Sequence, residues 1–439
     1  MTASRRKNMK KGNAFALLPI GVFLALYLGL GLVFEYGLKL YQGFYKMSVV
    51  AAFMAAILTA CLQDRSRSFE EKLSIMGSGV GDKDVITMLL IFLTAGAFVG
   101  VVGRESAQSV AWFLLDLIPA RFAVAVLFVV ACFVSTAMGT SVGTILLLTP
   151  IAMEVSKAAG FVDELCVASV IGGAMFGDNL SFISDTTIAA CNGQGCKMSD
   201  KFKGNFLIAL PAAIGSLILI LVSTVMKDES VVLAGQWSLL QIAPYVLVLL
   251  LGILGVNVFL VLLIGIFSGS VIMLSTGAVS FPDLLGNMTS GISGMFETSM
   301  VAILVAAMCA LVRVNGGFDA LLSLIRKVFR GRRGGQLGMG LLVGAMDIAT
   351  ANNTVAIVMT GSIAKDISDE YGIDPRRTAS LLDIFASVVQ GLIPYGAQLL
   401  YASAGAGVSA VQIIPYMYYP MLMAVSAVVF ILIQKTDKK

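Results

Sequence analysis

The sequence contains no histidine, and charged residues make up only 13% of its 439 positions. Ordinary soluble domains carry roughly twice that share of charge. Because 58% of the residues are hydrophobic, a soluble fold of this length could not cover its surface with polar groups, and we expect an integral membrane protein. The absence of histidine excludes a catalytic imidazole, a histidine metal site and an imidazole pH sensor. Proton chemistry near neutral pH is therefore left to carboxylates, ahead of Lys, Cys or Tyr.

Several functional motifs are absent as well. Neither GxxxxGK[ST] nor GxGxxG occurs in a strand–turn–helix setting, so direct coupling to ATP is not expected. The net charge is only +4, and the basic residues form short clusters between apolar runs, which does not fit nucleic-acid binding. An intramembrane protease would need histidine or a GxGD element, and Met175 occupies the first glycine position of that element. We expect neither an enzyme nor a cofactor.

Long uncharged runs account for much of the chain. Crossing the hydrocarbon core of a membrane takes about 20 residues, and the uncharged runs are Val85–Gly103, Phe122–Met153, Gly204–Met226, Val231–Pro282 and Ile384–Gln434. The fourth is long enough for two passes, and the fifth for two passes or one pass plus a re-entrant piece. Because the runs are continuous rather than alternating, a closed barrel is not expected. The sequence predicts an all-α membrane protein with about 10–13 transmembrane elements.

Basic clusters and aromatic residues indicate how the chain sits in the membrane. Residues 5–11 include Arg5, Arg6, Lys7, Lys10 and Lys11, and they precede an apolar run from Ala14 to Phe34. That run lacks a signal-peptide cleavage site, so we interpret it as the first transmembrane helix, with a cytoplasmic N-terminus. The Arg/Lys-only loop at Arg326–Arg333 is also expected in the cytoplasm. Trp112, Trp237 and Tyr416–Tyr419 fit interfacial aromatic belts.

The two halves of the chain resemble each other when they are aligned at one constant offset. Ile151, Ala152, Ser156 and Gly160 then align with Ile363, Ala364, Ser368 and Gly372. In each half a polar break leads into an apolar half-helix, and a charged tip near a glycine follows. After the tip come another apolar helix and a second polar break. The pattern predicts two repeats, residues 1–230 and 231–439.

The charged tips of the two repeats differ in sign. The first tip carries Asp163 and Glu164, whereas the second carries Arg376 and Arg377. Opposite charge favours opposite sides of the membrane, so the repeats are predicted to be inverted. Inverted repeats with broken helices or re-entrant hairpins are typical of secondary transporters, whose substrate site lies between the repeats near the bilayer midplane.

Four polar breaks interrupt the apolar runs, at residues 139–144, 177–187, 350–354 and 390–398. Irregular backbone at membrane depth is tolerated only where protein or water satisfies its polar groups. Hydroxyl and amide oxygens are hard ligands suited to an alkali cation. The candidate ion- or substrate-binding residues of this kind are Thr140, Ser141, Thr144, Asn179, Ser181, Ser184, Thr186, Thr187, Asn352, Asn353, Thr354, Gln390 and Gln398.

Two carboxylates, Asp178 and Asp185, lie in the second break and are the expected metal ligands. A charged Asp at the centre of a membrane helix costs at least about 2.5–3.5 kcal/mol, so two of them imply partners or a function. One carboxylate holds either a proton or Na⁺, and this competition is the minimal requirement for an antiporter. The alternative is that both cap helix N-termini at the membrane surface.

Three further observations bear on the substrate. Asp383 and Asp347 are each either a second titrating group or a helix cap, and Asp383 is included among the candidate ion-binding residues. No isolated Lys or Arg within the membrane is evident that could pair with an anionic substrate. That absence favours a cation or a zwitterion as the transported species.

The segment G-D-N-L-S-F-I-S-D-T-T at 177–187 resembles the NhaC-type Na⁺/H⁺ antiporter family of the ion transporter superfamily. The segments A-N-N-T-V-A-I-V (351–358), D-P-R-R-T-A-S-L-L-D (374–383) and Q-G-L-I-P-Y-G-A-Q (390–398) are similar to it too. Asp178, Ser181, Ser184, Asp185, Thr186 and Thr187 match the family motif. Phe182 departs from it, because the family has proline there. The resemblance implies an inner-membrane carrier with inverted repeats, re-entrant hairpins and an elevator-like motion.

Two functions remain open from the sequence. The first is exchange of Na⁺ for H⁺, with the lipid bilayer and these two ions as partners. The second is Na⁺- or H⁺-coupled carriage of an amino acid or small organic acid, because the resembled family includes members that carry such solutes. Abundant glycine permits close helix packing but identifies no dimer face, so the sequence leaves a homodimer open.

Overall fold

The computed structural model describes residues 12–38, 46–181, 184–225, 236–254, 256–320, 323 and 331–433. The basic cluster at residues 5–11, Phe182 and most of the 326–333 loop lie outside these residues. Within them every element is a helix, which confirms the all-α prediction. A helix satisfies its own backbone hydrogen bonds, as a chain that crosses lipid requires.

The helices of the first half begin near residue 14. Their bounds are η2 (Ala14–Leu17), α1 (Leu18–Leu24), η3 (Ala25–Gly29), α2 (Leu30–Leu32), η4 (Val33–Gly37), α3 (Val49–Gln63), α4 (Phe69–Val80), α5 (Lys83–Leu117), α6 (Ala120–Met138), α7 (Ser141–Ala159), α8 (Asp163–Leu180), α9 (Asp185–Gln194) and α10 (Met198–Val225). Helix α5 contains a break at Gly103, whose φ is +66°.

The second half follows the same plan. Its bounds are α11 (Leu239–Ile253), α12 (Val258–Ser275), α13 (Phe281–Gly294), α14 (Phe296–Val314), α16 (Gly331–Thr350), α17 (Asn353–Tyr371), α18 (Pro375–Gln390), α19 (Ala397–Ala406), α20 (Ala410–Ile413), η6 (Ile414–Tyr416) and α21 (Tyr418–Ile433). Helices α11 and α12 occupy the long uncharged run before residue 282, as the run length predicts.

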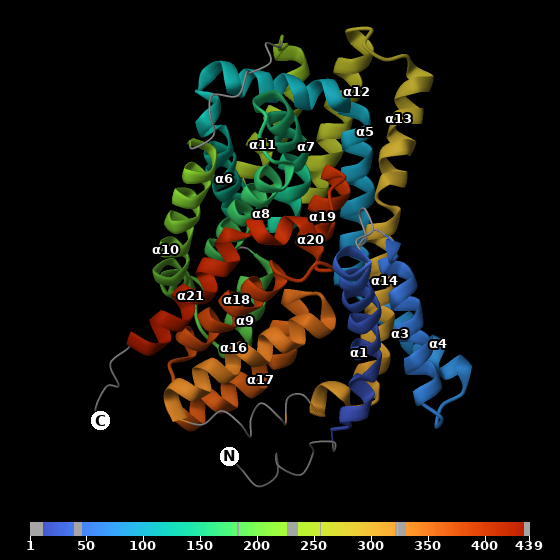
Figure 1. The fold of residues 1–439 in the computed structure, drawn as a ribbon, viewed down its shortest axis with the longest axis vertical. Helices are drawn as coiled ribbons and strands as arrows, with labels where there is room; N and C mark the ends of the chain where they lie inside the picture. The colour runs from blue at the N-terminus through green and yellow to red at the C-terminus, as the bar shows by residue number, and fades with distance from the viewer. Residues whose placement is uncertain are drawn as a thin grey trace.

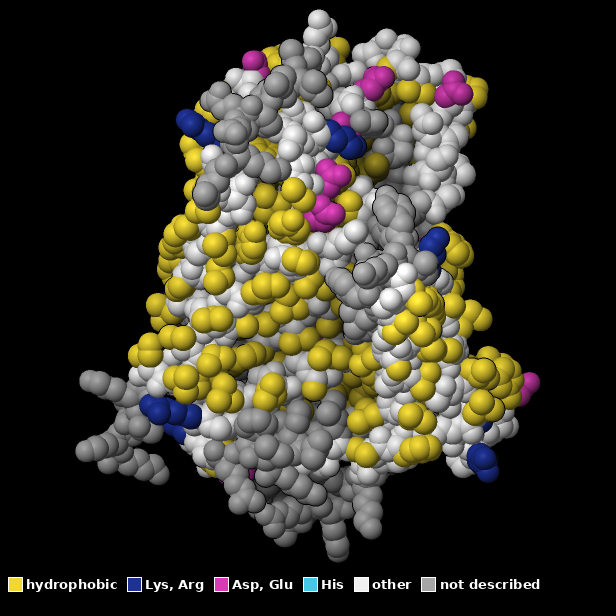
Figure 2. Space-filling model, viewed as in Figure 1, with side chains coloured by type: hydrophobic (Ala, Val, Ile, Leu, Met, Phe, Trp, Pro, Cys, Tyr) yellow, Lys and Arg dark blue, Asp and Glu magenta, His cyan; other side chains and the backbone are white. Residues whose placement is uncertain are grey.

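The apolar helices are numerous enough for a multi-pass membrane protein. Five helical segments of the described chain are long and apolar enough to cross a membrane, and two bent pairs raise that number to seven. One bent pair joins 397–406 to 410–416 at 104°, which is the geometry of a broken span or of a re-entrant loop. The uncharged run from Ile384 to Gln434 predicted either two passes or one pass plus a re-entrant piece. With five shorter apolar helices, the described residues hold twelve apolar elements. Figure 2 shows hydrophobic side chains over the middle of the surface, with most charged side chains toward its two ends.

The alignment of the two halves recurs in the helix boundaries. The offset that places Ile151 on Ile363 also places both ends of α7 on those of α17, and both ends of α9 on those of α19. Left-handed residues end these helices at the same offset, Gly160 with Gly372 and Gly195 with Gly407. The turn before α7 is left-handed at Gly139, and its counterpart before α17 is Ala351, with φ of +50°. Two copies of one helical plan therefore make up the molecule.

The copies pack reciprocally and point in opposite directions. Helix α4 packs against α14 of the other copy, and α13, the counterpart of α4, packs against α5. In Figure 1 α4 lies at the lower end of the molecule and α13 at the upper end. Likewise α7 lies in the upper half and α17 in the lower half. This arrangement is the inverted repeat that the opposite tip charges predicted.

The helices that begin or end at the polar breaks occupy the centre of the molecule. Helix α6 packs on α7 and α8, and α16 packs on α17 and α18 in the same way. Helix α9 crosses to pack on α17, while α19 crosses to pack on α7. Helices α9 and α19 therefore each belong to one copy by their place in the sequence but pack against helices of the other copy. This exchange brings the four breaks together.

Candidate functional site

A cavity of about 120 Å³ lies where the four breaks meet. Each break contributes side chains to its wall, and α5 closes it with Thr87 and Ile91. Ten of the candidate residues from the sequence line it, namely Thr140, Ser141, Asp178, Asp185, Thr186, Asn352, Asn353, Thr354, Gln390 and Gln398. We call this space the ion cavity, after the ion-binding role that the sequence predicts for these residues. Residues from both halves of the chain thus line the same cavity.

Four helices start at the ion cavity. Its lining includes first-turn residues of α7, α9, α17 and α19. A helix N-terminus presents unpaired backbone N–H groups and carries a partial positive charge. The carboxylates of Asp178 and Asp185 offset that positive potential. The cavity therefore combines donors from the backbone with two anionic side chains and several neutral oxygens.

Asp178 sits in the last turn of α8 and is 9% exposed. Its Oδ2 accepts a hydrogen bond from Ser141 Oγ at 3.1 Å, and Ser141 Oγ accepts one from Gln398 Nε2 at 3.2 Å. The chain of contacts joins α8 and α7 of the first copy to α19 of the second. A helix-capping role at the membrane surface is wrong for Asp178, because it lies at the C-terminal end of a buried helix.

Asp185 is the first residue of α9, and its side chain is exposed at the edge of the ion cavity. The capping residue is its neighbour Ser184, whose Oγ accepts a hydrogen bond from the Thr187 backbone N–H at 3.2 Å. Asp185 therefore does not cap the N-terminus of α9. It lines the same space as Asp178 from the other end of the break.

The cavity-lining residues of the second copy include four amides and no carboxylate. Asn352 caps α17, since its Oδ1 accepts a hydrogen bond from the Val355 backbone N–H at 3.0 Å. Gln390 and Gln398 are both buried, and their Oε1 atoms have no hydrogen-bond partner among the described residues. Two unpaired buried acceptors are costly in a protein interior. Their position on the cavity wall suits a ligand that accepts electron density, such as a cation.

Six other candidate residues do not line the ion cavity: Thr144, Asn179, Ser181, Ser184, Thr187 and Asp383. Thr144 Oγ1 donates to the Thr140 carbonyl oxygen at 3.1 Å within α7. Thr187 Oγ1 donates to the Ser181 carbonyl oxygen at 2.9 Å and so bridges the break. Asn179 and Asp383 belong to a separate polar network directly behind Asp178.

That network is centred on a buried lysine. Lys201 in α10 is completely buried, and its Nζ lies 2.7 Å from Asp383 Oδ2. The sequence prediction concerned a Lys or Arg that could pair with an anionic substrate; Lys201, which it did not identify, is paired with Asp383 of the same chain instead. In the sequence Lys201 lies near Lys197, Asp200 and Lys203, so the segment resembles a charged loop. In the structure Lys201 lies on the buried face of its helix, together with Asn205, Ile208 and Ala212. Their spacing of about four residues was the pattern that could have revealed it.

The remaining members of the network hold Asp383 and Asn179. Asn205 Nδ2 donates to Asp383 Oδ2 at 2.6 Å, and Ser380 Oγ donates to Asn205 Oδ1 at 2.6 Å. Asn179 Oδ1 accepts hydrogen bonds from Ser387 Oγ at 3.2 Å and Tyr419 Oη at 3.1 Å. Tyr419 was predicted in an interfacial belt and is instead fully buried. Its hydroxyl serves this network.

The helix-cap interpretation is wrong for Asp347 and Asp383, because both lie inside helices. Asp383 is in the middle of α18, and Asp347 is near the C-terminal end of α16. Asp347 is completely buried, and neither of its carboxylate oxygens has a hydrogen-bond partner among the described residues. It lies outside the lining of the ion cavity.

The described residues contain no group of three or more His, Cys, Asp or Glu side chains that could hold a metal ion. A cation in the ion cavity would therefore rely on Asp178 and Asp185 together with hydroxyl, amide and carbonyl oxygens. Such a mixed oxygen set suits an alkali cation better than a transition metal.

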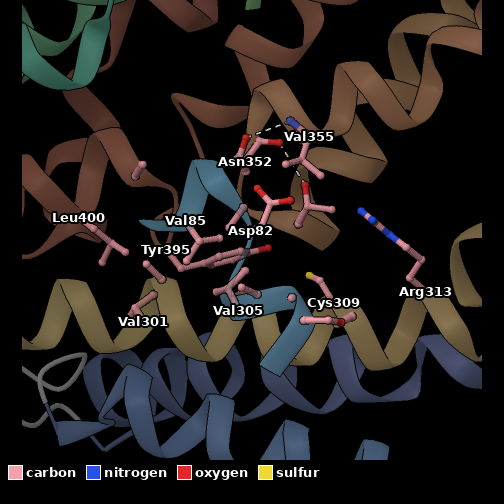
Figure 3. A pocket seen from close by; sticks show the side chains of 18 of the residues that line it. Asp82, Val85, Val301, Val305, Cys309, Arg313, Asn352, Val355, Tyr395 and Leu400 are labelled. Atoms are coloured by element: carbon pink, nitrogen blue, oxygen red, sulfur yellow. Dashed lines mark hydrogen bonds between the residues drawn. The ribbon is translucent and has the colours of Figure 1, made fainter. Parts of the chain in front are cut away.

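A larger cavity of about 250 Å³ adjoins the ion cavity, and the two share Ala351, Asn352 and Ala397 in their walls. Figure 3 shows Tyr395, Val301 and Val305 around its apolar part, with Arg313 at one side. Another cavity of about 320 Å³, near Glu154 and Lys157 at the end of α7, shares Tyr401 with it. The ring of Tyr401 packs on Phe92 with 4.3 Å between centroids. Tyr401 thus stands between these two larger spaces.

Comparison with known proteins decides the family. The Na⁺/H⁺ antiporter family matches this chain over residues 13–225 and 229–435. The chain belongs to the Na⁺/H⁺ antiporter family. It is therefore a multi-pass membrane protein of a transporter family, as the composition and the breaks predicted.

Its relatives differ in their named substrates. The chain is 25% identical to the Na⁺/H⁺ antiporter NhaC of Bacillus subtilis, over 80% of this chain and 83% of that one. It is 23% identical to the arginine/ornithine antiporter ArcD of Halobacterium salinarum, over 72% of each chain. It is 21% identical to a malate-2H⁺/Na⁺-lactate antiporter of B. subtilis, over 94% and 93% of the two chains.

Proposed function

We propose that this protein exchanges Na⁺ for H⁺ across the membrane, with Asp178 and Asp185 as the shared carboxylates. The observation that carries the proposal is their position in one small cavity with hydroxyl and amide oxygens from all four breaks. The family and the Na⁺/H⁺ antiporters among its relatives support it. Neutral oxygens supply coordination, and the two carboxylates supply the charge that Na⁺ requires.

Competition for the carboxylates provides the coupling. A protonated carboxylate is neutral and no longer attracts Na⁺, whereas bound Na⁺ disfavours protonation of the same group. The cavity therefore holds one species or the other. Exchange follows if the cavity changes its side of the membrane only when it holds Na⁺ or H⁺. An empty cavity then cannot return, so movement of one ion requires movement of the other in the opposite direction.

The inverted copies supply a route for that movement. The cavity lies where the copies meet, which is the position of the site in transporters built from inverted repeats. The 250 Å³ and 320 Å³ spaces meet at Tyr401 and would serve as alternating entrances.

We propose that residues 1–230 and 231–439 form the two repeats. The separate family matches over 13–225 and 229–435 support that division.

The proposal is tested by reconstitution into liposomes that contain a pH-sensitive dye. Addition of Na⁺ outside should make the lumen more alkaline, because Na⁺ enters as H⁺ leaves. The apparent KM for Na⁺ should rise as the pH falls, since protons occupy the same carboxylates. A lumen pH that does not respond to Na⁺, in liposomes that contain folded protein, would contradict the proposal.

A second candidate is coupled transport of an amino acid or small organic acid. The 250 Å³ space beside the ion cavity exceeds what Na⁺ alone needs, and two relatives are named for organic substrates. Uptake of radiolabelled amino acids and dicarboxylates into the same liposomes distinguishes the two. Saturable organic uptake without Na⁺/H⁺ exchange would favour this candidate over the first.

We propose a location in the cell membrane with the N-terminus in the cytoplasm. Arg332, Arg333, Arg376 and Arg377 lie at the starts of α16 and α18, which Figure 1 places in the lower half of the molecule. Basic residues concentrate on the cytoplasmic side of membrane proteins. A periplasmically active reporter fused to the N-terminus should remain inactive; an active fusion would reverse the orientation.

A further inference from the structure

The side chain of Lys201 sits in an environment made of oxygen atoms. Its Nζ lies 2.7 Å from Asp383 Oδ2, and it donates hydrogen bonds to the Asn179 carbonyl oxygen at 3.1 Å and to Thr187 Oγ1. These are a carboxylate, a backbone carbonyl at a helix break and a hydroxyl. All three are the hard oxygen ligands that alkali cations prefer. The ammonium group thus occupies a position built like a cation site.

This position is next to the ion cavity. Asn179 follows Asp178 in the chain, and Thr187 follows Thr186, and both Asp178 and Thr186 line the cavity. The helix break between α8 and α9 therefore presents one set of oxygens to the cavity and another set to Lys201. Asp383 reaches the same position from α18 of the second copy. One set of oxygens thus faces the open cavity, and the other surrounds the ammonium group of Lys201.

We propose that Lys201 is a tethered cation that fills a second cation position and thereby limits the protein to one Na⁺ per transport cycle. The inference rests on the proposed Na⁺/H⁺ exchange and adds its stoichiometry. Because the ammonium group is covalently held, it cannot leave with the transported ion. Asp383 consequently has a permanent counter-charge and does not recruit Na⁺ from the cavity.

The surroundings of Asp383 explain what removal of Lys201 would do. Its Oδ2 also accepts hydrogen bonds from Asn205 at 2.6 Å and Asn179 at 3.3 Å, while Oδ1 has no partner among the described residues. Two amide donors do not neutralise a buried carboxylate, and a buried charge without compensation is strongly unfavourable. A small cation from the neighbouring cavity would restore the balance. Loss of the lysine should therefore create a second Na⁺ site.

The test counts Na⁺ bound to the purified full-length protein by equilibrium dialysis with ²²Na⁺. We expect one Na⁺ per chain in the wild type and two in Lys201→Ala. The double variant Lys201→Ala/Asp383→Asn should return to one, because it removes the vacant negative charge. Lys201→Arg should keep one, since it preserves a tethered cation. Lys203→Ala is the matched control, because Lys203 lies exposed on the same helix.

The outcomes separate this inference from the proposed function. Two Na⁺ per wild-type chain would overturn the inference directly, even if Lys201→Ala fails to fold. One Na⁺ in a folded Lys201→Ala variant would also overturn it, while Na⁺/H⁺ exchange by the wild type stood. No Na⁺ bound and no exchange in the wild type would remove the proposed function and the inference together. A purely structural role for Lys201 would alter stability but not the number of ions bound.

Discussion

Asp178 and Gln390 occupy equivalent places in the two copies, in the last turns of α8 and α18, and both line the ion cavity. One copy carries an acid at this place, and the other carries a neutral amide. The pair shows how an inverted repeat yields an asymmetric site. The first copy supplies charge, whereas the second supplies uncharged oxygen.

Replacement of Asp178 by Asn should abolish most Na⁺-dependent exchange. A charge–charge contact at about 4 Å in a medium of effective dielectric constant about 20 is worth about 4 kcal/mol, so we expect at least a roughly 100-fold loss of apparent Na⁺ affinity. The measurement is Na⁺-driven alkalinisation of proteoliposomes. Asp185→Asn should have the same direction of effect. Normal exchange by both folded variants would place the site elsewhere.

Replacement of Gln390 by Glu should strengthen cation binding in the cavity. The change keeps an oxygen at the position of the unpaired Gln390 Oε1 and adds negative charge beside Asp178 and Asp185. We expect a lower apparent KM for Na⁺ at alkaline pH, where the added acid is ionised, and little change at acid pH. The pH series is the internal control. An unchanged KM at every pH would show that position 390 does not contact the ion.

The left-handed residue before each half-helix offers a stability test. Ala351 has φ of +50°, whereas its counterpart Gly139 has φ of +70°. A left-handed conformation costs a non-glycine residue about 1–2 kcal/mol, and the entropic cost of glycine is about 0.5–1 kcal/mol. Ala351→Gly should therefore raise the thermal stability slightly, and Gly139→Ala should lower it by about 1 kcal/mol. Melting in detergent by intrinsic fluorescence measures both. A lower stability of Ala351→Gly, or a higher stability of Gly139→Ala, would refute the strain argument.

The crossing of α5 and α13 depends on two glycines in direct contact. A methyl group at Gly291 would overlap the carbonyl oxygen of Gly96, and neither backbone can move away cheaply. Overpacking of this kind costs about 1–3 kcal/mol, so Gly291→Ala should lower the melting temperature. Gly294 on the same helix has open space where a methyl group would sit, and Gly294→Ala is the matched control. Equal effects of the two changes would contradict the close approach.

Tyr401 stands between the 250 Å³ and 320 Å³ cavities and packs on Phe92. Its hydroxyl group is buried without a hydrogen-bond partner among the described residues. We therefore expect the aromatic ring, and not the hydroxyl group, to separate the two cavities. Tyr401→Ala should produce a Na⁺ leak that is not accompanied by H⁺ movement, whereas Tyr401→Phe should stay coupled. Flux of ²²Na⁺ and lumen pH, recorded on the same liposomes, reveal the difference. Tight coupling in Tyr401→Ala would exclude the barrier role.

Much of the site was accessible from sequence because its parts are local. Gly, Ser, Thr, Asn and Gln in otherwise apolar runs predict where helices break, and the first residues of α7, α9, α17 and α19 fall at these breaks. The constant offset between the halves was visible from few identities, yet it recurs in the helix boundaries. The ligand roles of the sixteen candidate residues remain predictions, and ten of these residues line one cavity.

Lys201 shows where sequence reasoning stops. Exposed or partly exposed neighbours make its segment resemble a surface loop. The spacing of the buried residues Lys201, Asn205 and Ile208 indicates an inward face, but only the structure shows that Lys201 pairs with Asp383 from the other half of the chain. From the sequence, Asp383 could be a helix cap or a titrating group, and only its partner in the structure distinguishes these roles. Pairing between distant residues depends on how helices pack, and local composition does not encode it.

The sequence by itself determined a membrane protein of two inverted copies with broken helices, since hydrophobicity and backbone hydrogen bonding in lipid leave few other solutions. The tertiary structure alone decided which broken ends face one cavity, which acid is paired with a lysine and where Tyr401 stands between the two larger spaces. Those outcomes depend on contacts between the two copies, such as α9 with α17, α19 with α7 and α10 with α18, because helix packing places residues from distant parts of the chain within contact distance.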